Sequence, residues 1–253
     1  MQTNILKLES LRKIFGGVVA VDNLSLSFNK GEVTSLIGPN GAGKTTVFNL
    51  ITGFLKPTSG KINFNGTELN HKKPHVIAAM GIGRTFQNVQ VFSNMTVLEN
   101  VMVGRHLRSQ SGMFFSSILP PMLRGEEKRI RSSAKERLAL LGLDPYADLP
   151  AGSLPLGNQR MLEIARALAL EPALLFLDEP ASGLNARETV VMGRLIQKIK
   201  SMNITVVLVE HDMELVMDIS DKVAVINFGK LIAEGTPKEV QLNPDVINAY
   251  LGT

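Results

Sequence analysis

A glycine-rich segment, residues 38–45, constrains the fold of this chain more than any other part of its sequence. A short run with a strand-like pattern, Val33–Ile37, precedes it, and a stretch with apolar residues at helical spacing follows it and stops at Gly53. The segment is therefore predicted to be a loop between a buried strand and the start of a helix. It fits the pattern G-x-x-x-x-G-K-[ST] in full, and it reads Gly38-Pro39-Asn40-Gly41-Ala42-Gly43-Lys44-Thr45.

The chemistry of this segment, called the phosphate loop below, points to a nucleotide. Glycines allow backbone N–H groups to turn inward as a concave anion site, and the helix start adds its positive end. Lys44 would reach the β- and γ-phosphates, and the Thr45 hydroxyl can bind Mg²⁺. A glycine-rich turn arising by chance would not need a strand before it and a helix after it. The loop thus predicts a nucleotide site with ATP and Mg²⁺ as cofactors.

Composition narrows the class of protein further. The chain has 253 residues, of which 44% are hydrophobic, and this length allows one large domain or two small ones. No apolar run approaches the ~20 residues of a membrane-spanning helix, and the first residues lack the pattern of a signal peptide, so a cytoplasmic location is expected. With no cysteine, disulfides, thiol nucleophiles and Cys-ligated zinc are excluded. The net charge is +4 and the charged residues are scattered along the chain, so no nucleic-acid partner is expected.

The remaining pattern predicts an α/β domain with a helical insertion. Strands alternate with helices after residue 157, with helices expected at 157–170 and 186–200 and strands at 173–177 and 204–209. Such alternation predicts parallel βαβ units. Residues 96–143 instead show helical spacing. We therefore expect a single domain whose nucleotide-binding core comprises residues 1–87 and 158–253, with a helical subdomain at 88–157.

Acidic residues follow one of the predicted buried strands. Asp178 and Glu179 come directly after Leu174–Leu177, and the carboxyl ends of parallel strands are where open α/β sheets place ligands. Asp178 would hold Mg²⁺, and Glu179 would orient and deprotonate the attacking water. His211 follows a second strand, so it is expected at the same edge. A solvated acidic pair and a structural histidine are the alternatives for these residues taken singly.

In this order, the motifs resemble those of the ATP-binding cassette (ABC) ATPases over nearly the whole chain. The resemblance implies an ABC ATPase fold, in which a P-loop NTPase core carries an N-terminal antiparallel β region and an inserted helical subdomain. It also implies a role for each matching residue. These roles are adenine stacking by Phe15, phosphate contacts by the loop including Thr46, Mg²⁺ and water contacts by Gln87, metal binding by Asp178, catalysis by Glu179 and γ-phosphate sensing by His211.

More narrowly, the chain resembles the LivG-type ATPase subunits of branched-chain amino acid importers. The resemblance rests on residues 38–49, 83–87, 159–166 and 243–247, and on the long insertion before residue 154. It implies a protein on the inner face of the cell membrane, bound to transmembrane permease subunits and a second ABC ATPase subunit, and acting indirectly with a solute-binding protein. ATPases of urea or amide importers and of a lipopolysaccharide exporter share much of this pattern, so they remain alternatives.

Two features of the chain concern its partners. The family signature, usually Leu-Ser-Gly-Gly-Gln, is here Leu154-Pro155-Leu156-Gly157-Asn158, and the aspartate usual in the loop after the catalytic glutamate is Asn185. Since Pro155 offers neither a hydroxyl nor an N–H, a heterodimer with a subunit bearing a full signature is favoured over a homodimer. The uncharged stretch 109–123 predicts either a surface for the permease or local core packing.

Other nucleotide-binding classes fit less well. ABC proteins that act on ribosomes or DNA generally carry two cassettes or a long coiled coil, and 253 residues hold neither. A GTPase would need Asn-Lys-x-Asp after the phosphate loop, whereas the Asn29-Lys30 pair precedes it. The sequence therefore favours a transporter ATPase.

Overall fold

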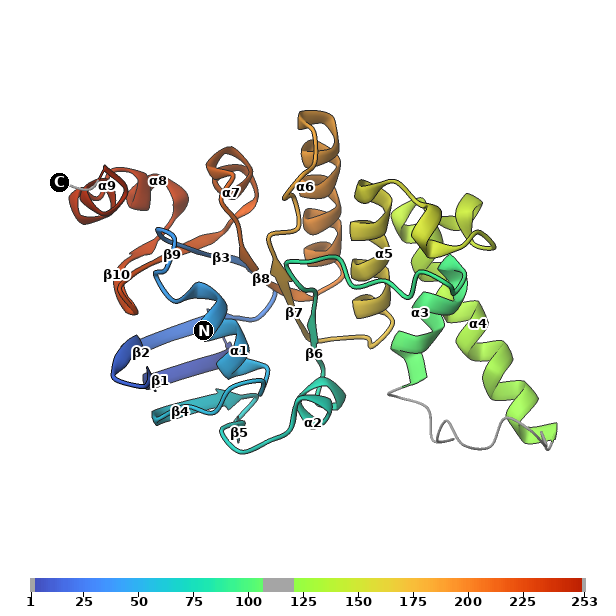
Figure 1. The fold of residues 1–253 in the computed structure, drawn as a ribbon, viewed down its shortest axis with the longest axis horizontal. Coiled ribbons are helices and arrows are strands. Elements are labelled where there is room, and N and C mark those ends of the chain that lie inside the picture. Colours follow the sequence, from blue (N-terminus) through green and yellow to red (C-terminus); the bar gives the residue numbers. More distant parts are fainter. Residues whose placement is uncertain (1–2, 107–120, 252–253) are drawn as a thin grey trace.

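The computed structural model describes residues 3–106 and 121–251, and within them the strands form two sheets (Figure 1). One sheet is antiparallel, with strand order β2-β1-β4-β5. The other has the order β10-β9-β3-β8-β7-β6 and is parallel from β9 to β6, with β10 antiparallel at its edge. The strands are β1 (Asn4–Phe15), β2 (Val18–Asn29), β3 (Val33–Ile37), β4 (Ser59–Phe64), β5 (Thr67–Glu68), β6 (Ile82–Arg84), β7 (Leu174–Asp178), β8 (Thr205–Val209), β9 (Lys222–Asn227) and β10 (Lys230–Gly235).

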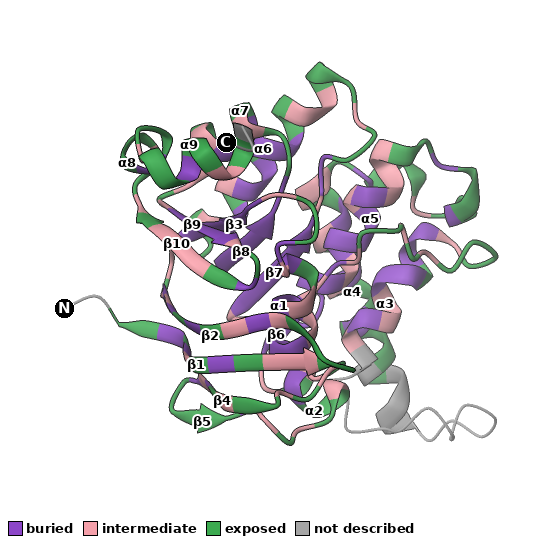
Figure 2. Cartoon of the chain, turned by 60° about the vertical axis from the view of Figure 1, so that its left-hand side comes forward, coloured by how far each residue is buried: buried purple, intermediate pink, exposed green. Residues whose placement is uncertain are grey.

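The parallel sheet is buried on both faces, as its apolar strands require. All residues of β3, β7 and β8 are buried (Figure 2). Side chains alternate between two clusters: Phe176 packs with the antiparallel sheet and α1 (Lys44–Ile51), and Leu175 and Leu177 pack with α5 (Leu156–Leu168), α6 (Ala186–Ser201) and α7 (Met213–Ile219). The predicted parallel βαβ core is confirmed.

Helices far from the antiparallel sheet form a third cluster. Here α3 (Val97–His106) and α4 (Pro121–Leu141) pack on α5, around buried residues that include Val101, Leu138 and Leu162. Figure 1 shows these helices on the side of the molecule away from β1 and β2. The short helices η1 (Asp144–Tyr146) and η2 (Ala151–Ser153) lead from α4 back to α5. Most of the uncharged stretch 109–123 lies outside the described residues.

Several elements differ from the sequence-based prediction. The strands β1 and β2 are 12 residues each, much longer than the strand-like runs that they contain at 5–8 and 24–28. Three more elements lack a sequence pattern long enough to reveal them, namely β6, α2 (Pro74–Ala79) and α8 (Pro237–Gln241). The final helix is α9 (Pro244–Leu251). Among the described residues, no helix is long and apolar enough to cross a membrane.

Candidate functional site

The phosphate loop joins β3 to α1, as the sequence predicts, and two of its glycines are required by close backbone approaches. A Cβ atom on Gly38 (φ 151°) would lie 2.0 Å from the carbonyl oxygen of Ile226, and one on Gly43 (φ 103°) would lie 2.4 Å from that of Ala20. No described side chain caps the start of α1, and its first turn holds no acidic residue. The N–H groups of this turn are therefore free of competing side-chain acceptors, which suits an anion.

The Lys44 side chain folds back onto its own phosphate loop. Its side chain is buried, and its Nζ donates hydrogen bonds to the carbonyl oxygens of Gly38 (2.7 Å) and Pro39 (3.0 Å). Burial lowers the pKa of the Lys44 ammonium, while the charges of Glu179 and Asp178 act in the opposite direction. The ammonium thus feels the charge of both carboxylates, and its hydrogen bonds go to carbonyl oxygens, which phosphate oxygens can replace.

Asp178 ends β7 and is 2% exposed. Its Oδ2 accepts a hydrogen bond of 3.0 Å from Nη2 of Arg84, whereas its buried Oδ1 has no hydrogen-bond partner within the described residues. Burial raises the pKa of the Asp178 carboxyl, and the Arg84 guanidinium opposes that rise. A buried acceptor without a donor is costly in a folded protein, so Oδ1 is an atom positioned for a ligand.

Glu179 is the centre of a polar cluster that joins three predicted catalytic residues. Nε2 of Gln87 lies 3.1 Å from both carboxylate oxygens of Glu179, and Nε2 of His211 lies 3.1 Å from Oε1. The glutamate side chain is 15% exposed and the histidine side chain is 46% exposed, so the cluster opens to solvent on the His211 side. The ends of β7 and β8 and the segment after β6 meet here, as expected for a parallel sheet.

A second buried acid, Glu210, supports this cluster from behind. It accepts hydrogen bonds from the backbone N–H groups of Ala181 (2.6 Å) and His211 (2.9 Å). Burial raises the pKa of Glu210, and these backbone donors oppose the rise. The carboxylate therefore ties the turn after Glu179 to the turn that carries His211.

The other predicted nucleotide contacts lie around the loop opening. Asn40, Gly41 and Thr45 are exposed, Thr46 is partly exposed, and Ala42 is buried. Phe15 ends β1 with 42% of its surface exposed, 4.9 Å from the Lys13 ammonium. The β1–β2 hairpin reaches the loop, because Ala20 of β2 meets Gly43. The exposed Phe15 ring thus belongs to the hairpin that contacts the phosphate loop.

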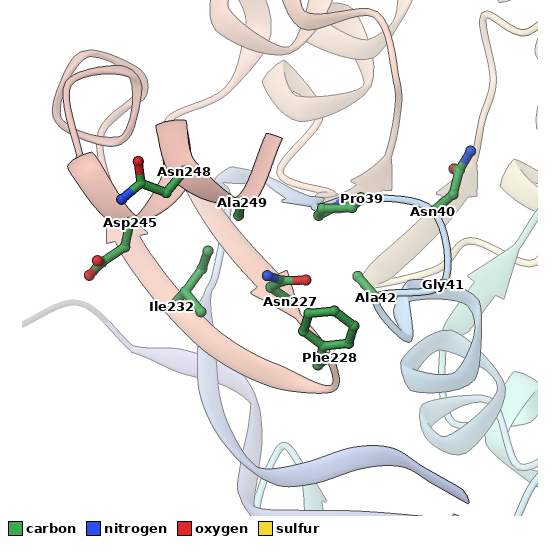
Figure 3. Close-up of a pocket in the computed structure, with 10 residues that line it drawn as sticks. All are labelled: Pro39, Asn40, Gly41, Ala42, Asn227, Phe228, Ile232, Asp245, Asn248 and Ala249. Atoms are coloured by element: carbon green, nitrogen blue, oxygen red, sulfur yellow. The ribbon is translucent and has the colours of Figure 1, made fainter. Parts of the chain in front are cut away.

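A cavity of about 520 Å³ lies on the outer side of the loop. Figure 3 shows it between the loop residues Pro39–Ala42 and the α9 residues Asp245, Asn248 and Ala249, with Asn227 and Phe228 along one side. Burial raises the pKa of Tyr250 on the same helix, and a hydrogen bond with the Gly38 backbone opposes this rise. The last helix therefore contacts the loop directly.

The signature segment, Leu154–Asn158, is not brought to the phosphate loop of the same chain. Leu154 is buried in the helical cluster, Pro155 is the N-cap residue of α5, and Gly157 lies against Glu188 and Leu184. With Asn158, Gly157 lines a small cavity of about 190 Å³ on the α6 side. Asn185 is the N-cap residue of α6 and forms a capping box with Glu188. The asparagine that replaces the usual aspartate therefore still caps this helix.

Sequence reasoning assigned no role to three residues that organise this site. Arg84 binds Asp178, Arg160 donates a hydrogen bond of 3.0 Å to the carbonyl of Glu179, and Glu210 joins two turns. Their surroundings come from segments distant in sequence, so no local pattern marks them. One signal was present, because Arg84 and Glu210 adjoin the motifs that carry Gln87 and His211.

Comparisons with known proteins place the chain in a family. The profile of the ABC transporter family matches residues 21–182, and a profile described as branched-chain amino acid ATP-binding cassette transporter matches residues 230–253. The chain is 46% identical to the LivG ATP-binding protein of high-affinity branched-chain amino acid transport in Salmonella typhimurium, across 100% of this chain and 99% of that protein. BraF of Pseudomonas aeruginosa, with the same transport description, shows the same identity and coverage.

Solved structures agree with these relatives. A nucleotide-free ATP-binding cassette from an ABC transporter superposes with a TM-score of 0.86 at 35% identity, covering 99% of this chain and all of that one. The ADP conformation of an ABC transporter cassette gives the same values. A dimeric bacterial ABC transporter cassette gives a TM-score of 0.78 at 25% identity, covering 92% of this chain and 98% of that one. The chain is therefore an ATPase that belongs to the ATP-binding cassette family of ABC transporters.

Proposed function

We propose that this chain is the ATP-hydrolysing subunit of an importer of branched-chain amino acids. Two findings support the solute class. The similarity to LivG and BraF extends over the full length of the chain, and the C-terminal residues 230–253 match a profile specific to branched-chain amino acid cassettes. The proposed ATP hydrolysis is supported by the contacts of Gln87 and His211 with the Glu179 carboxylate, whose charge also acts on the buried Lys44.

In the proposed mechanism, the chain's own groups bind the nucleotide and direct one water molecule. Phe15 stacks on adenine, and the phosphate-loop N–H groups, Lys44 and Thr46 bind the phosphates. Glu179 accepts the proton of the attacking water, while Gln87 and His211 hold its carboxylate in place through their 3.1 Å contacts. Phosphoryl transfer depends mainly on positioning and charge stabilisation, and these residues supply both from this chain's side of the site.

The residues present fit a magnesium ion bound together with the nucleotide. The unpartnered, buried Oδ1 of Asp178 is an acceptor of the kind that Mg²⁺ prefers, and Thr45 is the loop residue that would supply its hydroxyl. No group of three acidic, histidine or cysteine side chains within the described residues could hold a metal by itself. Magnesium is commonly bound through one or two protein oxygens plus substrate phosphates. When bound, the ion neutralises charge on the phosphates and completes the set formed by Thr45, Asp178 and Gln87.

The proposed assembly contains permease subunits in the membrane, this chain on the cytoplasmic face, and a second ATPase subunit. A related cassette is dimeric, and the signature segment of this chain lies away from its own phosphate loop. Leu154, Gly157 and Asn158 would therefore face the ATP of the partner subunit. We propose a heterodimer, because a homodimer would place Pro155 at both nucleotides and lose a charge-assisted hydroxyl contact of roughly 1.5–3 kcal/mol at each.

Purification of the native complex tests this function. An affinity-tagged copy of the chain is isolated from membranes of its own source, and the co-purified proteins and the solute of the associated binding protein are identified by mass spectrometry. We expect permease subunits, a second ATPase with a full signature, and leucine, isoleucine or valine. A complex that carries urea, another amide or a lipopolysaccharide would contradict the proposed solute class.

A further inference from the structure

Arg84, at the end of β6, connects two parts of the catalytic site through a buried guanidinium. Its Nη1 donates hydrogen bonds to Oδ1 of Asn49 (2.7 Å) and Oγ1 of Thr52 (2.9 Å), both from the region of α1. Its Nη2 donates to Oδ2 of Asp178 at 3.0 Å. The Arg84 side chain is 7% exposed and that of Asp178 is 2% exposed. One planar group thus links the helix that follows the phosphate loop to the carboxylate at the end of β7.

Aromatic rings surround this guanidinium on several sides. Its central carbon lies 5.0 Å from the ring centroid of Phe86, 5.7 Å from that of Phe48 and 5.8 Å from that of Phe54. Phe54 and Phe86 also contact each other edge to face, at 5.7 Å between centroids. Rings at these distances attract a cation. Because the side chains of Arg84 and Asp178 are 7% and 2% exposed, the charge on Arg84 acts on Asp178 with little screening by solvent.

Stability alone is a weak reason for such a pair. A buried ion pair often stabilises a fold no more than apolar residues of similar volume, because both charges lose their hydration. A planar fork, however, fixes direction as well as charge. With Oδ2 bound to Arg84, rotation of the Asp178 carboxylate is restrained, and Oδ1 stays buried and without a hydrogen-bond partner in the part of the chain that the structure describes. The segment carrying Arg84 continues directly into Phe86 and Gln87, whose amide contacts Glu179.

We propose that Arg84 is a positioning residue for the magnesium site: it holds Oδ2 of Asp178, presents Oδ1 to the ion, and fixes this carboxylate relative to α1 through Asn49 and Thr52. This inference rests on the proposed binding of Mg²⁺ by Asp178. Arg84 touches neither the ion nor the reacting phosphate, and acts through the carboxylate. Loss of the guanidinium would leave nucleotide binding by the loop in place and weaken the part of that binding that depends on magnesium.

The test measures nucleotide affinity with and without magnesium. Binding of a fluorescent ATP analogue, mant-ATP, to the full chain is titrated in Mg²⁺ and in EDTA, and the ratio of the two Kd values gives the magnesium gain. We expect Arg84→Met to keep its Kd in EDTA within about twofold and to lose about tenfold or more of the gain, as for other residues that orient a metal ligand. Arg84→Lys should be intermediate, since an ammonium keeps the charge without the fork.

Two further variants keep the test decisive if Arg84→Met does not fold. Asn49→Ala leaves the charge of Arg84 and removes one of its anchors, so it should lower the magnesium gain in the same direction. Arg105→Met is the matched control, because it removes a guanidinium whose ion pair with Glu171 (2.7 Å) lies outside the site. This control should keep the wild-type gain.

The outcomes separate this inference from the proposed function. Asp178→Asn should abolish the magnesium gain if its carboxylate binds the ion. A full gain in Asp178→Asn would show that the metal assignment itself is wrong. Loss of the gain in Asp178→Asn, with an unchanged gain in both Arg84→Met and Asn49→Ala, would overturn the role of Arg84 alone.

Discussion

Glu179 reaches its position at the site through an uncommon backbone conformation. Its φ is +50°, in the left-handed region that costs roughly 1–2 kcal/mol for a residue with a side chain. Two contacts hold it there, because its N–H donates to the carbonyl of Val209 (2.9 Å) and its own carbonyl accepts from Arg160 (3.0 Å). Strain of this kind persists where the surroundings determine the conformation and function benefits. The turn thus aims the carboxylate at Gln87 and His211.

Burial of the Glu210 carboxyl makes the stability of the folded chain depend on pH. Burial raises its pKa in the folded state, so folding is accompanied by proton uptake at this group. Its contribution to stability is complete below the pKa of the unfolded chain, about 4.3, and declines as pH rises through the folded pKa. Compared with Glu210→Gln, which does not titrate there, the wild-type chain should lose relative stability as pH increases.

Urea unfolding of both proteins at a series of pH values measures this difference in the free energy of unfolding. We expect the wild-type value minus the variant value to fall with increasing pH. A difference that stays constant, or that rises with pH, would show that burial does not raise the pKa of the Glu210 carboxyl.

The sequence predicted those strands that a local pattern of residues indicates. The strands β3, β7 and β8 are short, mainly apolar runs that end at glycine or acids, and their carboxyl ends hold the phosphate loop, Asp178 and the turn to His211. In contrast, β6 has three residues, too few for any periodicity to appear. Two of the rings beside the Arg84 guanidinium, Phe48 and Phe54, belong to α1 and the turn after it, which lie far from Arg84 in the sequence. A lone arginine in a sequence is more simply interpreted as a surface charge.

The start of α5 is the basis for a prediction about the two ATP sites of the proposed heterodimer. Pro155 is its N-cap residue and no side-chain hydrogen bond caps the helix within the described residues, so this signature segment offers no hydroxyl to a phosphate. In the proposed heterodimer, the ATP held by Lys44 of this chain faces the full signature of the partner, and the other ATP faces Pro155. Lys44→Ala should therefore reduce ATP turnover more than the equivalent substitution in the partner.

Steady-state ATP turnover of the assembled transporter, with each lysine variant in turn, measures this asymmetry. The wild-type complex and the double variant set the limits of the scale. If Lys44→Ala is the milder of the two substitutions, the site served by Glu179 is the less active one and the proposed arrangement is wrong.

For the whole molecule, both ends of the chain contribute to one core. The antiparallel sheet from the first residues packs through α1 on the parallel sheet, and α9 at the other end contacts the phosphate loop through Tyr250. The helical cluster of α3, α4 and α5 holds the signature segment away from this loop. One subunit therefore presents a phosphate-binding half and a signature half on different parts of its surface. This arrangement supports the proposed assembly with a second cassette.

We propose that ATP hydrolysis directed by Glu179 drives solute import. The most direct test measures ATP turnover and leucine uptake in the same proteoliposomes, prepared with the purified complex carrying either Glu179 or Glu179→Gln. Removal of a general base typically costs at least ~10²-fold in rate, so the variant should bind ATP normally and lose both turnover and uptake. Near-normal steady-state turnover by the Glu179→Gln complex would contradict the account.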